Sequence, residues 1–297
     1  MKQPFISMIL PTRGRVNSLE RFLKSITRHT DQPHQIEIIL VIDKDDHESI
    51  EFKFPDLIIK KRIVHSGQSM GSLNQAGFEV SSGRYLMLAN DDIEIQTDHW
   101  DSTLKSVLDK YRDSVILAHV NDLIFRHRLC TFPIVSREYC EIANGICPVG
   151  FTRYDIDDHI FATFRIAAAL GASRIIFFPF IIFNHLNYNM QSGRRKYSIN
   201  PEIKAQDDDL FNTLYGERLF VAIELCRRAG FEPSVKRILE LERNKNASHF
   251  ARRPFKLHIG RPKLREFNLV LNAAFPQINL NELIRRALKS NSSNCQT

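Results

Sequence analysis

Residues 85–95 read YLMLANDDIEI, and the character of this stretch changes from apolar to acidic in the middle. Its first five residues are apolar, which predicts a strand on its way through a core. Asn90, Asp91 and Asp92 then stand together, and apolar residues resume after them. Burying carboxylates beside a core is unfavourable unless they are paired or hold a cation. The stretch therefore predicts a strand that carries an acidic tip to a binding site.

Strands and helices alternate on both sides of this stretch. We expect strands at 5–10, 36–42, 57–64, 84–89 and 115–120, and helices at 18–29, 69–82 (stopped by Gly83) and 98–111. This alternation predicts an α/β fold with a mostly parallel, doubly wound sheet. Ligands bind at the carboxyl ends of strands in such sheets. The segments PTRGR, VIDKDD and NDD follow three of the strands, whose interiors we expect to be free of polar chemistry.

The composition limits the class of protein. The chain has 297 residues, of which 43% are hydrophobic and 25% charged, enough for a sizeable core. Its five cysteines form no CxxC pair, which argues against a disulfide framework or a zinc site and for a reducing compartment. The N-terminus lacks the apolar run of a signal peptide, and the most apolar segment, 175–183, is too short to span a bilayer. We expect a cytoplasmic protein.

The net charge is +7, and the basic excess is concentrated in residues 227–265. This region is either a solvated face or a peripheral contact with a membrane surface or an anionic polymer. The sequence has no aromatic-rich basic module, so nucleic acid is not an expected partner. GxGxxG and GxxxxGK[ST] are both absent, which argues against a dinucleotide site and a P-loop.

The series PTRGR, IILVIDKDD and GSLNQAGFEVSSGRYLMLANDD resembles the nucleotide-binding half of family 2 glycosyltransferases with the GT-A fold. The resemblance covers roughly residues 4–190 and is specific as a series. It implies a Rossmann-like, mostly parallel sheet and an inverting transfer from a nucleotide-diphosphate sugar with Mn²⁺ or Mg²⁺. One departure is Asn90, which stands where the family's Asp-x-Asp begins.

The resemblance also implies a donor site. The residues that correspond to nucleotide-binding positions are Pro11, Thr12, Arg13, Arg15, Asp43, Gly71, Asn74, Asn90 and Asp91. Asp43 is expected to contact the base, which favours uracil and a UDP-sugar, or else to be a loop carboxylate. Arg13 and Arg15 would stack on the base or pair with phosphate, or else lie in a solvated loop.

The resemblance implies that the acidic tip binds a metal ion. Asp92 is the expected ligand, with Asp91 nearby, and His185 is a further ligand. Two simpler alternatives stand beside this prediction. The acidic tip would be a strand-to-helix turn in which an Asp caps a helix, and His185 would be structural.

The acceptor side needs a base, which the resemblance places in an acidic cluster at a helix start. Asp155, Asp157 and Asp158 precede an apolar, buried helix, and we favour Asp158 as base with Asp157 second. The alternative is a helix cap, although three carboxylates exceed what capping needs, and crowding raises a carboxyl pKa. A basic loop follows, in which Arg194, Arg195 and Lys196 would stabilise the leaving diphosphate or form a solvated connector.

The character changes after this loop. We expect a GT-A catalytic domain at 1–198 and a mostly helical extension at 199–297, with helices at 207–231, 235–244 and 280–289. The acidic run 207–209 would favour a helix N-terminus. The predicted function is a metal-dependent inverting glycosyltransferase that acts on a glycan or lipid-linked acceptor in polysaccharide biosynthesis. The alternatives are a catalytically inactive nucleotide- or glycan-binding module and a sugar-phosphate nucleotidyltransferase; the single glycine in PTRGR argues against the latter.

Overall fold

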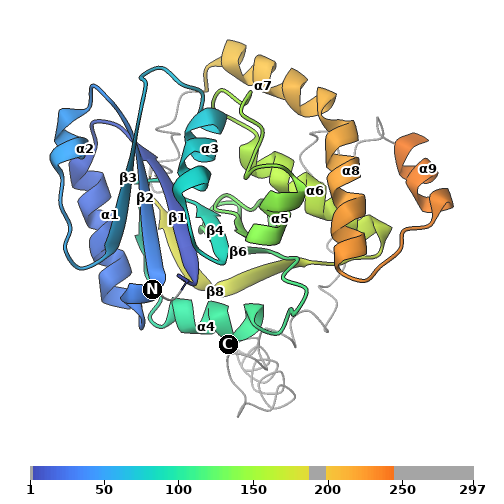
Figure 1. Cartoon of the computed structure of the whole chain (residues 1–297), viewed down its shortest axis with the longest axis horizontal. Coiled ribbons are helices and arrows are strands. Elements are labelled where there is room, and N and C mark those ends of the chain that lie inside the picture. Colours follow the sequence, from blue (N-terminus) through green and yellow to red (C-terminus); the bar gives the residue numbers. More distant parts are fainter. Residues whose placement is uncertain (1–2, 187–198, 244–297) are drawn as a thin grey trace, which may run out of the picture.

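A single mixed sheet forms the centre of the molecule (Figure 1). The computed structural model describes residues 3–186 and 199–243. The eight strands lie in the order β3-β2-β1-β4-β7-β6-β8-β5. Their bounds are β1 Ile6–Thr12, β2 Ile36–Asp43, β3 Ile58–Val64, β4 Tyr85–Leu88, β5 Ile93–Ile95, β6 Leu117–Asn121, β7 Ile134–Ser136 and β8 Ile175–His185.

The predicted parallel sheet is confirmed for the first four strands and for the β6–β8 pair, which all run parallel. Two strands depart from it. β7 runs antiparallel between β4 and β6, and β5 runs antiparallel to β8. The expectation of alternating strands and helices therefore fails after β4, where the short strand β5 follows the acidic tip without a helix between them.

Helices cover both faces of the sheet (Figure 1). Successive β1 side chains point to opposite sides, so that Met8 joins the core under α1 and α4 while Ile9 joins the core under α3, α5, α6 and α8. The helices are α1 Val16–His29, α2 His47–Glu51, α3 Met70–Val80, α4 Trp100–Leu108, α5 Arg137–Ile142, α6 Ile156–Leu170, α7 Pro201–Thr213, α8 Tyr215–Arg228 and α9 Val235–Arg243, with short 3₁₀ helices η1 Pro33–Gln35 and η2 Arg126–Arg128.

The helices after residue 199 share the core of the sheet. Phe211, Ala222 and Leu225 are buried in the same cluster as Ile9 and Ile39. The predicted helix 207–231 is in fact two helices, and α7 begins at Pro201, so the acidic run lies in the middle of a helix instead of at its start. The helix predicted at 280–289 lies outside the described residues. Within the described residues, no helix has the length and apolar character needed to cross a bilayer.

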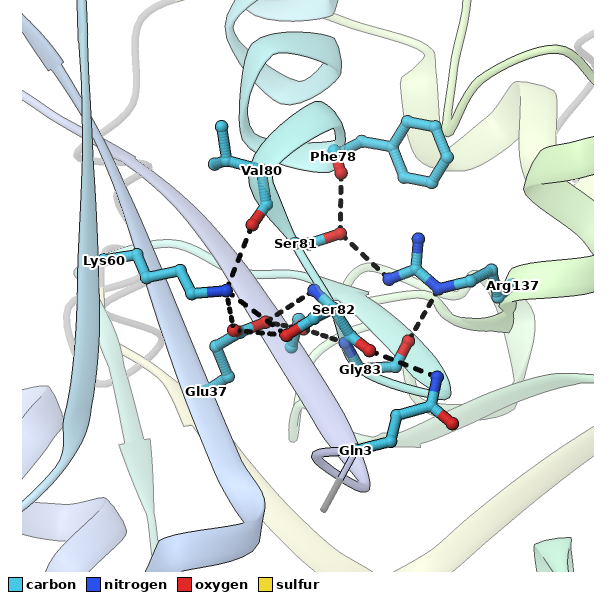
Figure 2. A network of polar contacts seen from close by, with 10 residues as sticks. Gln3, Glu37, Lys60, Phe78, Val80, Ser81, Ser82, Gly83 and Arg137 are labelled. Atoms are coloured by element: carbon cyan, nitrogen blue, oxygen red, sulfur yellow. Dashed lines mark hydrogen bonds and ion pairs between the residues drawn. The ribbon is translucent and has the colours of Figure 1, made fainter. Parts of the chain in front are cut away.

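A buried polar network lies at the amino ends of the parallel strands (Figure 2). Glu37 of β2 is 1% exposed, and it pairs with Lys60 of β3 and accepts hydrogen bonds from Ser7 and Ser82. The expectation that strand interiors carry no polar chemistry is therefore wrong. Gly83 does not end α3, which already stops at Val80. It packs against β1 instead, where a Cβ would lie 2.5 Å from the backbone nitrogen of Ser7.

Candidate active site

The loops after β1 and β2 meet through an ion-pair cluster. Arg13 pairs with Asp43 at 2.5 Å and with Asp45 at 2.7 Å. Asp46 accepts the backbone N–H of Gly14 at 2.8 Å and caps α2. The hydrogen bonds that Arg13 donates to Asp45 and Asp43 raise the pKa of its guanidinium, so that its charge is fixed. Asp43 and Arg13, both predicted to bind the nucleotide, therefore form one ion pair at the carboxyl edge of the sheet.

Asp91 anchors the acidic tip to the loop after β1. Its carboxylate is fully buried, accepts a hydrogen bond from the Thr12 hydroxyl at 3.1 Å and pairs with Arg15 at 3.1 Å. Burial raises the pKa of Asp91, although Arg15 and Thr12 oppose this shift. Both Thr12 and Arg15, predicted to bind nucleotide, are thus engaged by the acidic tip in this structure.

Asp92 and His185 are brought together by the pairing of β5 with β8. Ile93 lies opposite His185 in this register, and the N–H of Leu186 donates to the backbone oxygen of Asp92 at 2.8 Å. The Asp92 Oδ1 and His185 Nε2 atoms are 3.5 Å apart. Burial raises the pKa of Asp92, but the histidine and Arg15 more than offset this and leave it lowered. The helix-cap alternative for the acidic tip is wrong, because β5 follows it.

Asp92 and His185 offer only two ligands to a divalent cation. In residues 3–186 and 199–243, no group of three or more His, Cys, Asp and Glu side chains is arranged to hold a metal ion. Asp92 and His185 offer a carboxylate and an imidazole. Mg²⁺ is commonly bound through one or two carboxylates together with substrate phosphates. The pair therefore fits a cation whose remaining ligands come from a diphosphate.

The N-terminus of α3 is closed by the segment that leads to α6. The N–H of Gly71 donates to the Phe151 oxygen at 2.9 Å, and Ser69 donates to the Val149 oxygen at 2.6 Å. A Cβ on Gly71 would lie 2.3 Å from the Pro148 oxygen. The glycine thus allows two backbone segments to approach closely. Asn74, one turn later, is buried.

Two carboxylates stand side by side in the first turn of α6. Asp157 accepts the backbone N–H of Asp158 at 3.0 Å, and its own backbone oxygen lies 3.4 Å from the Cys130 sulfur. Burial raises the pKa of both carboxyls, and repulsion from Asp158 raises that of Asp157 further. The charges of Lys204 and Arg165 oppose the shift at Asp158. Of the two carboxyls, Asp158 is thus the one whose ionised form is stabilised by nearby cations.

Asp155, the third carboxylate, serves the junction between α6 and α7. It adopts a left-handed backbone conformation with φ 72° and is 5% exposed. Lys204 of α7 lies 3.7 Å from Asp155 and 3.0 Å from Asp208. The lysine ties the start of α6 to α7.

Asp207 holds the backbone just before α6. Its carboxylate is buried and accepts the N–H groups of Thr152, Arg153 and Tyr154 at 2.7–2.9 Å. Three backbone donors in a row form a specific cradle for this side chain. Sequence reasoning missed this role, because an acidic run in a helical pattern suggests only favourable helix electrostatics.

The segment 130–133 connects the two acidic groups. Pro133 accepts the N–H of Leu88 at 3.1 Å, just before the acidic tip. The Phe132 ring packs edge-on against His185 with centroids 5.2 Å apart, and Cys130 reaches Asp157. The Asp92–His185 pair and the Asp157–Asp158 pair therefore both adjoin one short segment.

Several solved structures are similar to this chain. S. aureus TarS 1-349 in complex with UDP-GlcNAc has a TM-score of 0.55 at 16% identity, over 90% of this chain and 79% of that chain. The same TarS fragment in complex with UDP has a TM-score of 0.53 at 14% identity, over 90% and 78% of the two chains. The mannosyltransferase PcManGT from Pyrobaculum calidifontis, in complex with GDP-Man and Mn²⁺, has a TM-score of 0.47 at 14% identity, over 94% and 89%. At these identities the TarS structures establish the fold alone.

The family model for glycosyl transferase family 2 matches residues 7–124, which contain β1 to β6 and the acidic tip. Residues 7–124 thus form a family 2-like glycosyltransferase region within a chain that has a GT-A fold. The match confirms the resemblance drawn from the three sequence segments, which all lie within these residues, and the expected class, a glycosyltransferase. No curated protein sequence matches the chain at a significant level.

The remaining predicted positions of the glycosyltransferase are placed as follows. Pro11 lies inside β1 opposite Val41, and Asn90 is exposed at the acidic tip. Arg194, Arg195 and Lys196 lie outside the described residues, as does most of the basic region 227–265. Asp45 and Asp46 stand in the quoted segment VIDKDD, but their partners come from the neighbouring strand loop.

Proposed function

We propose that this glycosyltransferase moves a sugar from a nucleotide-diphosphate donor, with a UDP-sugar favoured, to a hydroxyl of a glycan or lipid-linked acceptor, with inversion at the anomeric carbon. The observation that carries the proposal is that Asp92–His185 and Asp157–Asp158 both adjoin segment 130–133. Transfer needs a place for the leaving diphosphate and a carboxylate for the incoming hydroxyl. One edge of the sheet offers both.

The nucleoside would bind at the loops after β1 and β2. Asp43 has a side chain that is only 12% exposed, and it lies beside the half-exposed Arg13. A carboxylate in this position accepts an N–H from a base, while the planar guanidinium can stack on it or pair with phosphate. The TarS complexes with UDP and UDP-GlcNAc support uridine as the nucleoside. Arg13 would then exchange part of its contact with Asp43 for contact with the donor.

Asp92 and His185 would hold Mg²⁺ or Mn²⁺. When bound, the cation would supply Lewis-acid stabilisation of the charge on the leaving diphosphate. Asp92 suits this role because its pKa is lowered, so that it is ionised at neutral pH. Asp91, which is fully buried and engaged by Thr12 and Arg15, would position the tip.

Asp158 would act as the base. Its carboxylate takes the proton from the acceptor hydroxyl as that oxygen forms a bond to the anomeric carbon. The bond between this carbon and the diphosphate oxygen breaks, and its electron pair leaves with the nucleoside diphosphate. A displacement from the face opposite the leaving group inverts the configuration. Asp157 would hold the first turn of α6 through the N–H of Asp158.

The two alternatives predict different outcomes. An inactive nucleotide- or glycan-binding module would bind the donor without turnover, and the exposed Asn90 in place of a carboxylate favours this reading. A nucleotidyltransferase would release pyrophosphate instead of a nucleoside diphosphate. The released product therefore separates all three functions.

The test is release of nucleoside diphosphate from a panel of UDP-, GDP- and dTDP-sugars, with Mn²⁺ and with chelator, in the presence of candidate glycan acceptors. We expect metal-dependent release from one donor class. Asp158→Asn should lower the rate by roughly 10²–10⁴-fold while leaving donor binding unchanged. Asp209→Asn removes an exposed carboxylate from α7 and serves as the matched control. Full activity in Asp158→Asn would exclude this residue as base.

A further inference from the structure

A partly exposed aromatic and basic surface adjoins the proposed base. It consists of Arg126, His127 and Arg128 of η2, Phe161 of α6 and Phe177 of β8, and we name it the acceptor face. The three η2 side chains are exposed, and the two phenylalanines are partly exposed. The donor site described above uses none of these residues.

Helix geometry joins Phe161 to the carboxylates. Side chains three and four residues apart on a helix are neighbours, with Cβ atoms about 5–6 Å apart. Phe161 therefore lies one turn beyond Asp157 and Asp158, on the same side of α6. Arg165 lies one turn further, with its guanidinium 5.9 Å from the Phe161 ring centroid, and it interacts electrostatically with Asp158. One side of α6 thus runs from the base to an aromatic ring.

The second ring is held in place by a buried histidine. His119 of β6 is 1% exposed and packs against both Phe161 and Phe177, with ring centroids 5.7 and 4.9 Å away. His127 packs on the other phenylalanine, Phe177, at 6.1 Å. Burial lowers the pKa of His119 to about 3, so that it is neutral at physiological pH. The two phenylalanines therefore rest on an uncharged, buried support.

The basic side chains are presented by an anchored loop. The buried carboxylate of Asp122 accepts the N–H groups of Ile124, Phe125 and Arg126, and also the Thr131 hydroxyl. The loop then continues to Cys130, which reaches Asp157. Both ends of the loop are thus fixed, and one of them lies at the proposed base.

The guanidinium groups of this loop are available to a ligand. Arg128 donates to the backbone oxygens of Phe125 and Ile124. Across residues 3–186 and 199–243, neither Arg126 nor Arg128 forms an ion pair with an acidic side chain. Two unneutralised guanidiniums beside two rings suit a partner that has both an apolar ring face and an anion.

We infer that the acceptor face binds an anionic glycan, with a sugar ring against Phe161 and Phe177 and a phosphate or carboxylate group at Arg126 and Arg128. This inference rests on the proposed function, since it takes Asp158 as the point where the acceptor hydroxyl reacts. The carboxylates of Asp157 and Asp158 repel anions. The bound glycan is therefore oriented, with its anionic group at η2 and its reacting hydroxyl at α6.

The test measures the dissociation constants of the full chain for phosphorylated dextran, neutral dextran and inorganic polyphosphate at physiological salt. Arg126→Gln/Arg128→Gln should weaken binding of phosphorylated dextran roughly tenfold. The control Lys110→Gln/Arg112→Gln has the same charge change and spacing on an exposed segment after α4, and it should change binding less than about twofold. Equal weakening by both double variants would reduce the effect to net charge and overturn the inference.

The aromatic half is tested separately. Phe161→Leu and Phe177→Leu keep most of the side-chain volume, and thermal unfolding confirms that they fold. Each should weaken the binding of phosphorylated dextran several-fold and leave the binding of polyphosphate unchanged. Unchanged binding of phosphorylated dextran, or no binding to the wild type, would overturn the inference. Donor binding is measured in parallel with UDP and Mn²⁺. If the protein does not bind UDP with Mn²⁺, the proposed function is refuted and a glycan-binding face remains. If it binds the donor but these variants do not weaken binding of phosphorylated dextran, only the face is refuted.

Discussion

At the scale of single residues, Asp157 and Asp158 show how one helical turn can hold two carboxylates with different roles. Asp157 is tied to the backbone through the N–H of Asp158 and lies beside Cys130. Asp158 is electrostatically coupled to Lys204 and Arg165. A base must be ionised to accept a proton, and nearby cations favour that state. This contrast supports Asp158 as the base. Ionisation of Asp157 would place a second negative charge beside it in a buried site, which is unfavourable.

Because ionised Asp157 is unfavourable in the folded protein, Asp157→Asn should raise the stability of the fold in a pH-dependent way. The pKa of Asp157 is raised in the folded protein, so the carboxyl stabilises the fold while it is protonated, and this contribution is lost as pH rises through the folded pKa. Asparagine keeps the oxygen that accepts the Asp158 N–H. Each unit of pKa difference corresponds to about 1.4 kcal/mol, so the variant should unfold a few degrees higher than wild type at pH 8 and at the same temperature at pH 4. Lower stability at pH 8 would contradict the raised pKa.

At the scale of elements, α7 fixes the backbone that leads into α6. Asp207→Ala leaves three backbone N–H groups without their acceptor, so we expect a loss of at least about 2 kcal/mol in unfolding free energy by urea denaturation. Asp209→Ala, two residues along the same acidic run but exposed, should stay within about 0.5 kcal/mol of wild type. Equal effects of the two substitutions would show that only helix electrostatics matter.

The contact between α3 and segment 148–152 gives a second prediction at this scale. A methyl group at Gly71 meets the Pro148 oxygen, whereas Gly216 in α8 has nothing within 4 Å of an added Cβ. Gly71→Ala should destabilise the fold by about 1–3 kcal/mol and slow transfer, because the segment carries α6. Gly216→Ala should stabilise it by about 0.4–1 kcal/mol. A Gly71→Ala variant as stable as wild type would mean that the segment yields easily.

The sequence predicts elements where local pattern determines them. The run 36–42 reads as a buried strand because nearly every residue in it is apolar, and the structure confirms this with β2 at Ile36–Asp43. The pattern nevertheless did not predict that Glu37 takes part in a buried polar network, because its partners Lys60 and Ser82 lie on other elements. The antiparallel direction of β5 and β7 depends on pairing over long distances, which no local pattern encodes. Likewise, the pairing of Arg13 with Asp43 depends on how two loops meet.

At the scale of the whole molecule, the two ends of the sheet differ in chemistry. The amino ends of β1, β2 and β3 are locked by the Glu37 network, whose polar groups pair with one another (Figure 2). The carboxyl ends carry Asp43, Asp92 and the segment toward α6. The sequence placed these acidic residues at strand ends, but the link through segment 130–133 required the structure. The polar groups at the amino ends thus hold the sheet together, whereas the carboxyl ends carry the residues of the proposed site.

The most direct test of this account is thermal unfolding of the wild type and of Asp92→Asn with UDP, GDP, CDP and dTDP, each with Mn²⁺ and with chelator. A ligand at 100 times its dissociation constant adds about 2.7 kcal/mol. We predict a shift of several degrees with UDP and Mn²⁺ that disappears with chelator and in Asp92→Asn. No shift with any nucleotide in the wild type would contradict a metal-dependent nucleotide-sugar site at the acidic tip, and a shift retained in Asp92→Asn would remove Asp92 from it.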